Sequence, residues 1–315
     1  MTNVFVLNVG SSSIKYQVLD VETGAVHASG LVERIGVAGS DVPDHAAGLE
    51  RVLGELDGLQ IDAVGHRIVH GGPHFVQATV IDDVVEAGIE AISDLAPLHN
   101  PPGLAGIRAA RAALPHLTHV AVFDTAFHAT LTPAARDYAI DADVAATTRI
   151  RRFGFHGTSH RYVSRLAAEM LGRDADATLR LVVLHLGNGA SATAVLGGRS
   201  VDTSMGLTPL EGLVMGTRSG DIDPAVPLYL ARQHGYTIDQ IDDLLNKRSG
   251  LLGLAGRSDM RELVVAANQG EERATHALDV YVHRLRHYIG AYAAELGGID
   301  ALVFTAGVGE NSSYI

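Results

Sequence analysis

The sequence contains no cysteine, which removes several kinds of chemistry at once. Without a thiol the chain has no disulfide, no thiolate metal site, no iron–sulfur cluster and no cysteine nucleophile. Tryptophan is absent as well, and lysine occurs only at Lys15 and Lys247, so arginine carries nearly all the positive charge. A lysine that stands within a motif is therefore less often there by chance.

Positive charge and long apolar runs are also scarce. Lys and Arg total 24 against 36 Asp and Glu, and the net charge of −12 disfavours nucleic-acid binding. No stretch approaches 18 uninterrupted apolar residues, and the N-terminus lacks the basic and apolar regions of a signal peptide. We therefore expect a cytoplasmic protein that binds neither nucleic acid nor a membrane.

What remains is the composition of an ordinary globular α/β protein. The 315 residues are 47% apolar and 19% charged, and at roughly 150 residues per domain they predict two domains. Strands are expected at residues 4–9, 63–69, 118–123, 181–186 and 301–305. Helices are expected at 46–56, 84–95, 106–114, 227–233, 238–245 and 266–296, and one that opens at Thr132-Pro133. We place the two α/β domains at 1–130 and 131–315.

Each half of the sequence begins in a similar way. A shift of 177 positions places Leu7 on Leu184, Gly10 on Gly187 and Val18 on Val195. We interpret this as an internal repeat of a strand, a small polar loop and a second strand. The alternative is that any two hairpins with a glycine in the loop align this well.

Small-residue loops follow three apolar strands, at residues 10–13, 187–191 and 307–311. Such loops let backbone N–H groups approach an anion closely. None of them matches the P-loop or the Rossmann pattern. With Lys15 beside the first loop, we interpret them as a polyphosphate site, and three ordinary tight turns are the alternative.

Four polar residues stand where chemistry could occur. Arg67 and Arg218 lie beside glycines, and arginine suits bidentate contact with phosphate or carboxylate. Asp124 ends an apolar strand, a common site position in α/β folds, although it could instead cap the following turn. His156 suits a hydrogen-bond donor at a reaction centre, and a buried structural histidine is the alternative.

Long motifs run in order along the whole chain. They are NVGSSSIK at 8–15, GHRIVHGG at 65–72, APLHNPP at 96–102, FDTAFH at 123–128, GFHGTSH at 154–160, HLGNG at 185–189, GLTPLEG at 206–212, GTR at 216–218 and FTAGVGEN at 304–311. With these motifs the sequence resembles the acetokinase family, which belongs to a wider group with sugar kinases, actin and the Hsp70 ATPase. The resemblance implies two RNase H-like (actin-like) domains with a nucleotide cleft between them. It also implies reversible, Mg²⁺-dependent transfer of the ATP γ-phosphoryl group to acetate, giving acetyl phosphate and ADP.

The resemblance also implies a role for each matching residue and a homodimer formed through the second domain. Asp124, Arg67, His156 and Arg218 would act in catalysis. The substrate acid would contact Arg67, Val69, Leu98, Phe155 and Pro209. The nucleotide would contact Lys15, His185, Leu186, Gly187, Asn188, Gly189, Asp259, Met260, Arg261, Gly307, Val308, Gly309, Glu310 and Asn311. Asn8 would lie on the metal side.

Asp124 is the acid/base of the family pattern, and elementary chemistry favours another role. Carboxylic acids titrate near pH 4, so acetate is already ionised at neutral pH and needs no base. Asp124 would then organise Mg²⁺, a water molecule or an arginine.

Two other functions remain open from the sequence. One is a propionate or butyrate kinase with the same chemistry, and the other is a non-catalytic ATP-binding module of the actin/Hsp70 type. The chain is shorter than the family by several tens of residues, and the family's acidic metal ligand has no counterpart in it. The 315 residues are therefore either the ordered part of a longer polypeptide or a truncated one, and a truncated one is expected to bind Mg²⁺ weakly, to expose apolar surface and to have little activity.

Overall fold

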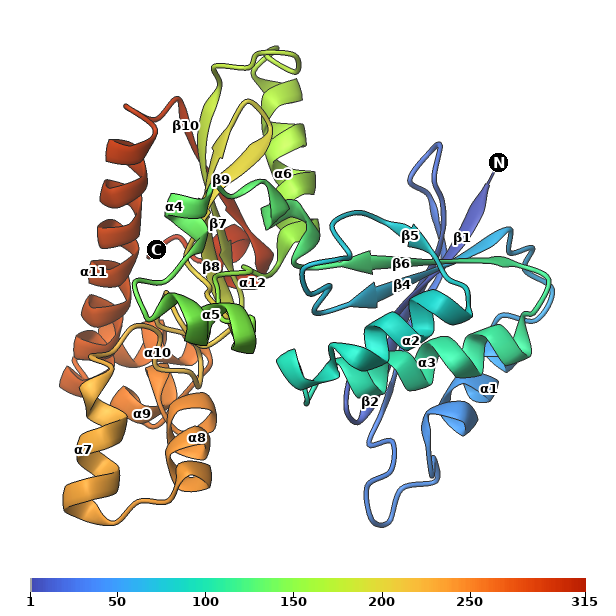
Figure 1. The fold of residues 1–315 in the computed structure, drawn as a ribbon, viewed down its shortest axis with the longest axis horizontal. Coiled ribbons are helices and arrows are strands. Elements are labelled where there is room, and N and C mark those ends of the chain that lie inside the picture. Colours follow the sequence, from blue (N-terminus) through green and yellow to red (C-terminus); the bar gives the residue numbers. More distant parts are fainter. Residues whose placement is uncertain (1) are drawn as a thin grey trace. The chain divides into compact units, whose positions relative to one another are not determined.

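A computed structural model describes residues 2–315, which divide into two units after Ala126 (Figure 1). The second unit begins at Phe127, four residues before the position chosen from the sequence. No helix within residues 2–315 is long and apolar enough to cross a membrane.

The first unit is built on a six-stranded sheet in the order β3-β2-β1-β4-β6-β5. Its strands are β1 (Asn3–Val9), β2 (Ser13–Asp20), β3 (Val26–Glu33), β4 (Ala63–Ile68), β5 (Thr79–Val80) and β6 (Thr118–Phe123). Its helices are α1 (His45–Glu55), α2 (Asp83–Ala91), α3 (Asn100–Ala113) and the short 3-10 helix η1 (Ser93–Leu95). A second 3-10 helix, η2 (Ala126–Thr130), contains the position in the chain at which the units divide.

The three central strands of this sheet bring polar residues to one edge. β1, β4 and β6 are parallel, so their carboxyl ends lie together. Asn8 of β1 pairs with Arg67 of β4 in the register, and Asp124 follows directly on β6. Buried apolar side chains such as Phe5 and Val64 hold these strands on the core beneath.

The second unit is built on a four-stranded sheet in the order β10-β7-β8-β9. Its strands are β7 (Arg180–Leu186), β8 (Ala190–Leu196), β9 (Arg199–Thr203) and β10 (Ala301–Thr305). Its helices are α4 (Pro133–Arg136), α5 (Ala142–Thr148), α6 (Gly157–Met170), α7 (Ala225–His234), α8 (Ile238–Lys247), α9 (Gly250–Ala255), α10 (Met260–Asn268), α11 (Glu272–Glu295) and α12 (Ala306–Asn311). Four consecutive residues of β7, 181–184, are at most 1% exposed, as expected for a central strand covered on both faces.

The internal repeat is visible in both sheets. The order β3-β2-β1-β4 in the first recurs as β9-β8-β7-β10 in the second, with the same parallel and antiparallel pairings. Each sheet also has an irregularity at the same point, after Val18 in β2 and after Ala194 in β8. Phe5 pairs with Val18 and Val182 pairs with Ala194, so the counterpart of Val18 is Ala194 and not Val195. The overlay from sequence was wrong by one residue there because the second hairpin loop is one residue shorter.

Two helix predictions were wrong in their extent. The helical region expected at 266–296 is broken between α10 and α11 by Gly270, whose φ of +86° lies in the left-handed region that glycine adopts freely. The helix expected from residue 106 begins at Asn100 instead. Its first turn contains two prolines, which that position tolerates because the first N–H groups have no partner within the helix.

The prediction of a loop at 307–311 is wrong, because these residues form most of α12. Glycine lowers helix propensity, which made the segment look like a turn. Within it, the Glu310 carboxylate accepts hydrogen bonds from the Thr305 hydroxyl (3.0 Å) and the Ala306 N–H (3.1 Å), which fixes the start of the helix. Gly309 faces β7, where an added Cβ would stand 3.6 Å from the Leu184 carbonyl oxygen and from Cβ of Leu186, at ordinary van der Waals contact.

Candidate active site

The guanidinium of Arg67 is held on two sides at the carboxyl edge of the first sheet. Its Nη2 donates to Oδ2 of Asp124 at 2.6 Å, and its Nε lies 3.1 and 3.2 Å from the two carboxylate oxygens. Its Nη1 donates to Oδ1 of Asn8 at 2.9 Å. The backbone N–H of Asp124 bonds the Ile68 carbonyl, so neighbouring parallel strands place both members of the pair.

Burial and charge act in opposite directions on this arginine. Burial alone would lower the pKa of Arg67, but the charge of Asp124 and its hydrogen bonds raise that pKa above its ordinary value. Asp124 is 1% exposed, whereas about a third of the Arg67 side chain (36%) remains exposed. Asp124 therefore fixes a permanent positive charge whose remaining surface is open to an anion.

The same cluster offers few ligands for a metal ion. Residues 2–315 contain no group of three or more histidine, aspartate or glutamate side chains suited to holding one. The Asn8 amide oxygen and the Asp124 carboxylate are engaged on different nitrogens of Arg67 and both accept hydrogen bonds from it. These residues do not form a Mg²⁺ site by themselves, since protein sites that lack substrate phosphates need more oxygen ligands.

In the second unit, four histidines gather where α6 begins and β7 ends. His156 caps α6 in a left-handed conformation, with φ of 55°. Its ring stacks on that of His185, with centroids 4.3 Å apart. His128 and His160 pack edge to face behind them, 5.8 Å apart. Burial lowers the pKa of His128 to about 4 and that of His160 well below its ordinary value, so these two rings are neutral.

Serine hydroxyls hold the rings of this cluster. The Ser191 hydroxyl lies 2.8 Å from Nδ1 of His156 and 2.7 Å from Nε2 of His160. The Ser159 hydroxyl lies 2.8 Å from Nδ1 of His185. Neither serine was predicted to have a role of its own, although Ser159 lies in the motif at 154–160 and Ser191 ends the small-residue loop at 187–191.

His156 and Arg218 converge on the glycine turn between β7 and β8. A Cβ atom built on Gly189 would lie 3.5 Å from Nε2 of His156 and 3.6 Å from Nη1 of Arg218. The Arg218 guanidinium donates to the Pro209 carbonyl at 3.1 Å, but no carboxylate within residues 2–315 forms an ion pair with it. Burial lowers the pKa of Arg218, so this group is a partly buried cation without a counter-charge. Such a group favours binding of an anion.

The loop that carries Pro209 is fixed by Arg152, another residue missed from the sequence. Its Nη1 donates to three successive backbone carbonyls, of residues 203–205, at 2.9–3.2 Å. Its Nη2 donates to the Glu211 carboxylate at 2.6 Å, and the Tyr138 hydroxyl donates to the same carboxylate. The charge of Glu211 raises the pKa of Arg152 in spite of its burial, so this ion pair holds both ends of the loop.

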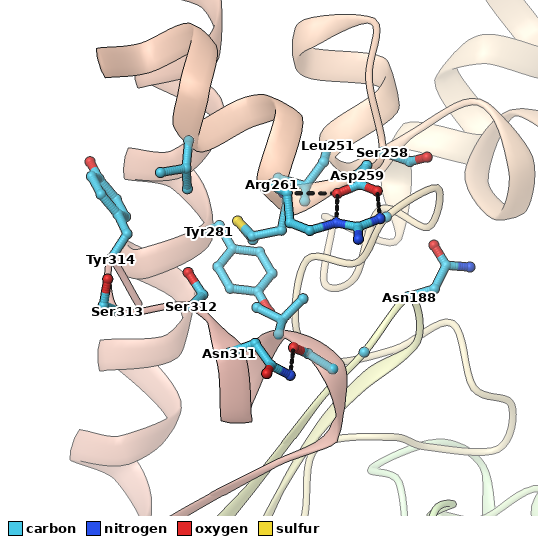
Figure 2. Close-up of a pocket in the computed structure, with 16 residues that line it drawn as sticks. Asn188, Leu251, Ser258, Asp259, Arg261, Tyr281, Asn311, Ser312, Ser313 and Tyr314 are labelled. Carbon is cyan, nitrogen blue, oxygen red and sulfur yellow. Dashed lines mark hydrogen bonds and ion pairs between the residues drawn. The ribbon is translucent and has the colours of Figure 1, made fainter.

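A cavity of about 900 Å³ lies within the second unit, and Figure 2 shows its walls. It is lined by Gly187, Asn188, Gly216, Leu251, Ser258, Asp259, Met260, Arg261, Val264, Tyr281, Gly307, Val308, Asn311, Ser312, Ser313 and Tyr314. The fold thus brings together parts of three segments that were predicted to contact the nucleotide. The volume lies within the range of small-molecule and cofactor sites.

Polar groups of the cavity wall are held in place by short local contacts. Asp259 caps α10, and its carboxylate forms an ion pair of 2.6 Å with Arg261, which Figure 2 shows folded back upon it. A Cβ on Gly216 would collide with Oδ1 of Asn188, so glycine at this position lets the Asn188 side chain keep its place on the wall. The Tyr281 hydroxyl is buried and has no hydrogen-bond partner within residues 2–315, and burial raises its pKa. No sequence motif indicated Tyr281.

Several residues predicted to contact the nucleotide do not line this cavity. Leu186 is a fully buried core residue, and the Glu310 side chain bonds the start of its own helix. His185, Gly189 and Gly309 lie in the same segments but are not among the lining residues. Lys15 belongs to the first unit, where it is exposed in β2.

The four apolar residues predicted to contact the substrate acid divide between the units. Val69 and Leu98 belong to the first, and Leu98 is 65% exposed. Phe155 and Pro209 belong to the second, and Phe155 is buried. Their assembly into one pocket stays a prediction.

Three features define the class of this protein. The two units share one strand order, and the first holds a fixed cation. The second holds a cation without a carboxylate partner among the described residues and a cavity of a size that suits a nucleotide. These are the features of a two-unit α/β protein that binds a nucleotide and a small anion. The profile of the Acetokinase family matches residues 3–315, and the chain belongs to that family.

Named relatives agree with this assignment. The chain is 57% identical to acetate kinase of Clavibacter michiganensis subsp. michiganensis, an alignment that covers 100% of this chain and 85% of the relative. It is 56% identical to acetate kinase of Streptomyces avermitilis, with 100% and 83% covered. The crystal structure of Porphyromonas gingivalis acetate kinase matches with a TM-score of 0.95 at 45% identity, covering 99% and 84%. A propionate kinase from Francisella tularensis matches with a TM-score of 0.95 at 41% identity, covering 99% and 85%.

Proposed function

We propose that the protein transfers the γ-phosphoryl group of ATP reversibly to acetate, giving acetyl phosphate and ADP. Beyond family membership, the proposal is supported by the environments of two arginines. Arg67 is held by a buried carboxylate with part of its guanidinium exposed, and Arg218 is partly buried without a carboxylate. Phosphoryl transfer needs such fixed positive charge, because its transition state spreads negative charge over the equatorial oxygens.

The reaction requires no base for its nucleophile. Acetate is ionised at neutral pH, so one of its oxygens forms the new bond to the γ-phosphorus as the bond to the β-phosphate oxygen breaks and ADP leaves. In this proposal Arg67 binds the acetate carboxylate or a phosphoryl oxygen, and Arg218 and His156 donate to the transferring group. Asp124 then acts on Arg67, which it contacts through both carboxylate oxygens.

The nucleotide part of the proposal rests on the cavity of the second unit. Asn188 and the glycines beside it would face the phosphates, because a glycine turn lets N–H groups approach an anion. Asp259, Met260 and Arg261 would contact the nucleoside. Mg²⁺ belongs to the proposal through the family, where it neutralises phosphate charge. The described residues do not form a Mg²⁺ site by themselves, so in this proposal the phosphates of ATP would supply most of its oxygen ligands.

Preference among short acids is part of the proposal as well. We assign the methyl group of acetate to Val69, Leu98, Phe155 and Pro209, and one added methylene changes binding by only about 1–3 kcal/mol. Propionate should therefore react less well than acetate. The likeness to the Francisella tularensis propionate kinase makes propionate the second candidate substrate. If butyrate reacted faster than acetate, this assignment of the apolar residues would be wrong.

The deciding experiment traps acetyl phosphate with hydroxylamine as the hydroxamate. ATP and Mg²⁺ are supplied with acetate, propionate or butyrate, and ADP release without any acid is measured in parallel. Hydroxamate that depends on acetate supports the proposal. ATP binding without hydroxamate would instead indicate a non-catalytic ATP-binding module. The expected homodimer is tested by light scattering, and the expected cytoplasmic location by fractionation of cells.

A further inference from the structure

A single buried hydroxyl joins two imidazole rings in the second unit. The Oγ of Ser191 lies 2.8 Å from Nδ1 of His156 and 2.7 Å from Nε2 of His160, and Ser191 is 0% exposed. A hydroxyl has one hydrogen, so it donates to one ring and must accept from the other. The two rings therefore cannot choose their tautomers independently.

The surroundings of His160 decide the direction of this chain of hydrogen bonds. His160 is fully buried and neutral, so it carries one ring proton. Its Nδ1 has no hydrogen-bond partner within residues 2–315. A proton on Nδ1 would be a buried donor without an acceptor, and burying such a donor is costly. A proton on Nε2 instead points at the Ser191 oxygen.

The intrinsic preference of imidazole acts in the same direction. A histidine side chain in water favours the tautomer with its proton on Nε2. If His160 donates from Nε2, the Ser191 hydroxyl donates to Nδ1 of His156, and both rings hold the favoured tautomer. The opposite direction forces both rings into the disfavoured one and also leaves the buried donor of His160 unpaired.

We propose that Ser191 and His160 are positioning residues that fix the proton of neutral His156 on Nε2. This nitrogen lies 3.5 Å from the point where a Cβ of Gly189 would stand, and Nη1 of Arg218 lies 3.6 Å from the same point. A neutral His156 therefore presents an N–H donor beside the glycine turn. If the proposed phosphoryl transfer holds, His156 donates to the transferring group without first becoming an imidazolium.

An imidazole and a guanidinium lie next to the His156 ring. The His185 ring stacks on it with centroids 4.3 Å apart, and two stacked cations would repel each other. The permanent charge of Arg218 converges on the same glycine. His160 behind Ser191 is neutral. The same logic holds for His128, whose Nε2 must donate to the Phe155 carbonyl, leaving its Nδ1 to accept from Ser200.

The test is ¹⁵N NMR of the full chain labelled at histidine, without nucleotide, near pH 7.5. Two-bond correlations from the ring protons distinguish the two neutral tautomers and the imidazolium, and His156→Asn and His160→Gln assign the signals. We expect a protonated Nε2 and an unprotonated Nδ1 in both rings. A proton on Nδ1 of either ring, averaged signals or an imidazolium would overturn the proposal.

Ser191→Ala provides the second arm. Without the hydroxyl, the His156 signals should lose their single-tautomer pattern, and kcat should fall about 10-fold, by loss of one oriented hydrogen bond, with little change in KM. Ser191→Thr restores a hydroxyl and should restore the pattern. Ser200→Ala is the matched control, because its hydroxyl serves His128, and the His156 signals should not change. A Ser191→Ala protein with the wild-type His156 pattern would also overturn the proposal.

The two proposals fail separately. If the protein gave no acetate-dependent hydroxamate but showed the expected ¹⁵N pattern, the proposed function would be wrong and the proposed roles of Ser191 and His160 would stand. If the protein were active but carried the proton on Nδ1 of His156, the proposed function would stand and the proposed roles of Ser191 and His160 would be wrong.

Discussion

Both oxygens of the Asp124 carboxylate contact the guanidinium of Arg67, the shortest contact being 2.6 Å between Oδ2 and Nη2. A carboxylate engaged in this way on one arginine is poorly placed to accept a proton from a substrate. The sequence left three partners open for Asp124, namely a metal, a water molecule and an arginine. The geometry favours the arginine, and this makes the role of Asp124 testable.

Asp124→Asn keeps the shape of the side chain and removes its charge. We expect kcat to fall by about 10²–10³-fold, because Arg67 is no longer fixed, which is the size of effect seen when one oriented donor is lost. The free energy of unfolding should fall by roughly 1–3 kcal/mol. This is less than for a fully buried pair, since Arg67 is partly exposed.

Hydroxamate assays across Mg²⁺ concentrations measure the outcome, and the Mg²⁺ dependence of the remaining activity should match that of the wild type. A markedly weaker Mg²⁺ response in Asp124→Asn would show that the carboxylate organises the metal instead. A loss of activity that recovers as pH rises would favour an acid/base role.

Replacing Arg218 should raise the stability of the protein and lower its activity. It is a partly buried cation without a carboxylate partner, so Arg218→Met removes a charge whose burial is costly. We expect the free energy of unfolding to rise by roughly 1–2 kcal/mol, while kcat falls by about 10²–10³-fold. Urea unfolding and the hydroxamate assay measure the two effects on one preparation.

Arg152→Met is the matched control for this pair of effects. Arg152 is also partly buried, but it is neutralised by Glu211 and bonded to three carbonyls. Its removal leaves those groups unpaired, so the free energy of unfolding should fall by about 3 kcal/mol. If Arg218→Met destabilised the protein as strongly as Arg152→Met does, the view of Arg218 as an uncompensated charge would be wrong.

The sequence predicted well those parts of the fold that depend on local pattern. Apolar runs such as 118–123 and 301–305 are strands at the predicted bounds, because short apolar runs rich in valine and phenylalanine favour strands whether or not both faces are buried. The Thr132 cap and the two glycine hairpins follow from equally local rules. The predicted bounds were wrong where glycine was taken as a sign of a turn, as in α12, whose two glycines stand within a helix.

The site was predictable where a residue stands at the end of a strand, and less so where tertiary contacts decide. Arg67 and Asp124 could be named from the sequence, but their direct contact depends on the order of parallel strands. Ser191 bridges residues 31 and 35 positions away, and no local pattern shows that. Tyr281 lines the cavity from the middle of α11, where helical periodicity marks it as a core residue only.

Acid should destabilise the protein through buried histidines. Burial lowers the pKa of His66 to about 3 and that of His128 to about 4, while unfolded histidine titrates near 6.5. Between the folded and unfolded pKa values, the unfolded chain binds protons that the folded chain does not, so stability is full above pH 6.5 and falls as pH falls. At pH 5 each histidine should cost about 2 kcal/mol.

Urea unfolding at pH 7.5 and pH 5 measures this loss. His128→Gln retains an amide donor for the Phe155 carbonyl, and its stability should depend less on pH than that of the wild type. His27→Gln is the control, because His27 is exposed and its loss should leave the pH dependence unchanged. Equal pH dependence in the wild type and His128→Gln would contradict the prediction.

Gly216→Ala should weaken nucleotide binding without a general loss of stability. A Cβ at this position collides with Oδ1 of Asn188, so the Asn188 side chain must leave its place on the cavity wall. We expect KM for ATP to rise about 10-fold, by loss of one hydrogen bond to a charged phosphate, with a smaller change in KM for acetate. Gly290→Ala is the control, since Gly290 lies within α11 with open space around it and should gain about 0.5–1 kcal/mol of stability with unchanged kinetics. Unchanged ATP kinetics in Gly216→Ala, with the fold intact by circular dichroism, would remove Asn188 and this wall from the nucleotide site.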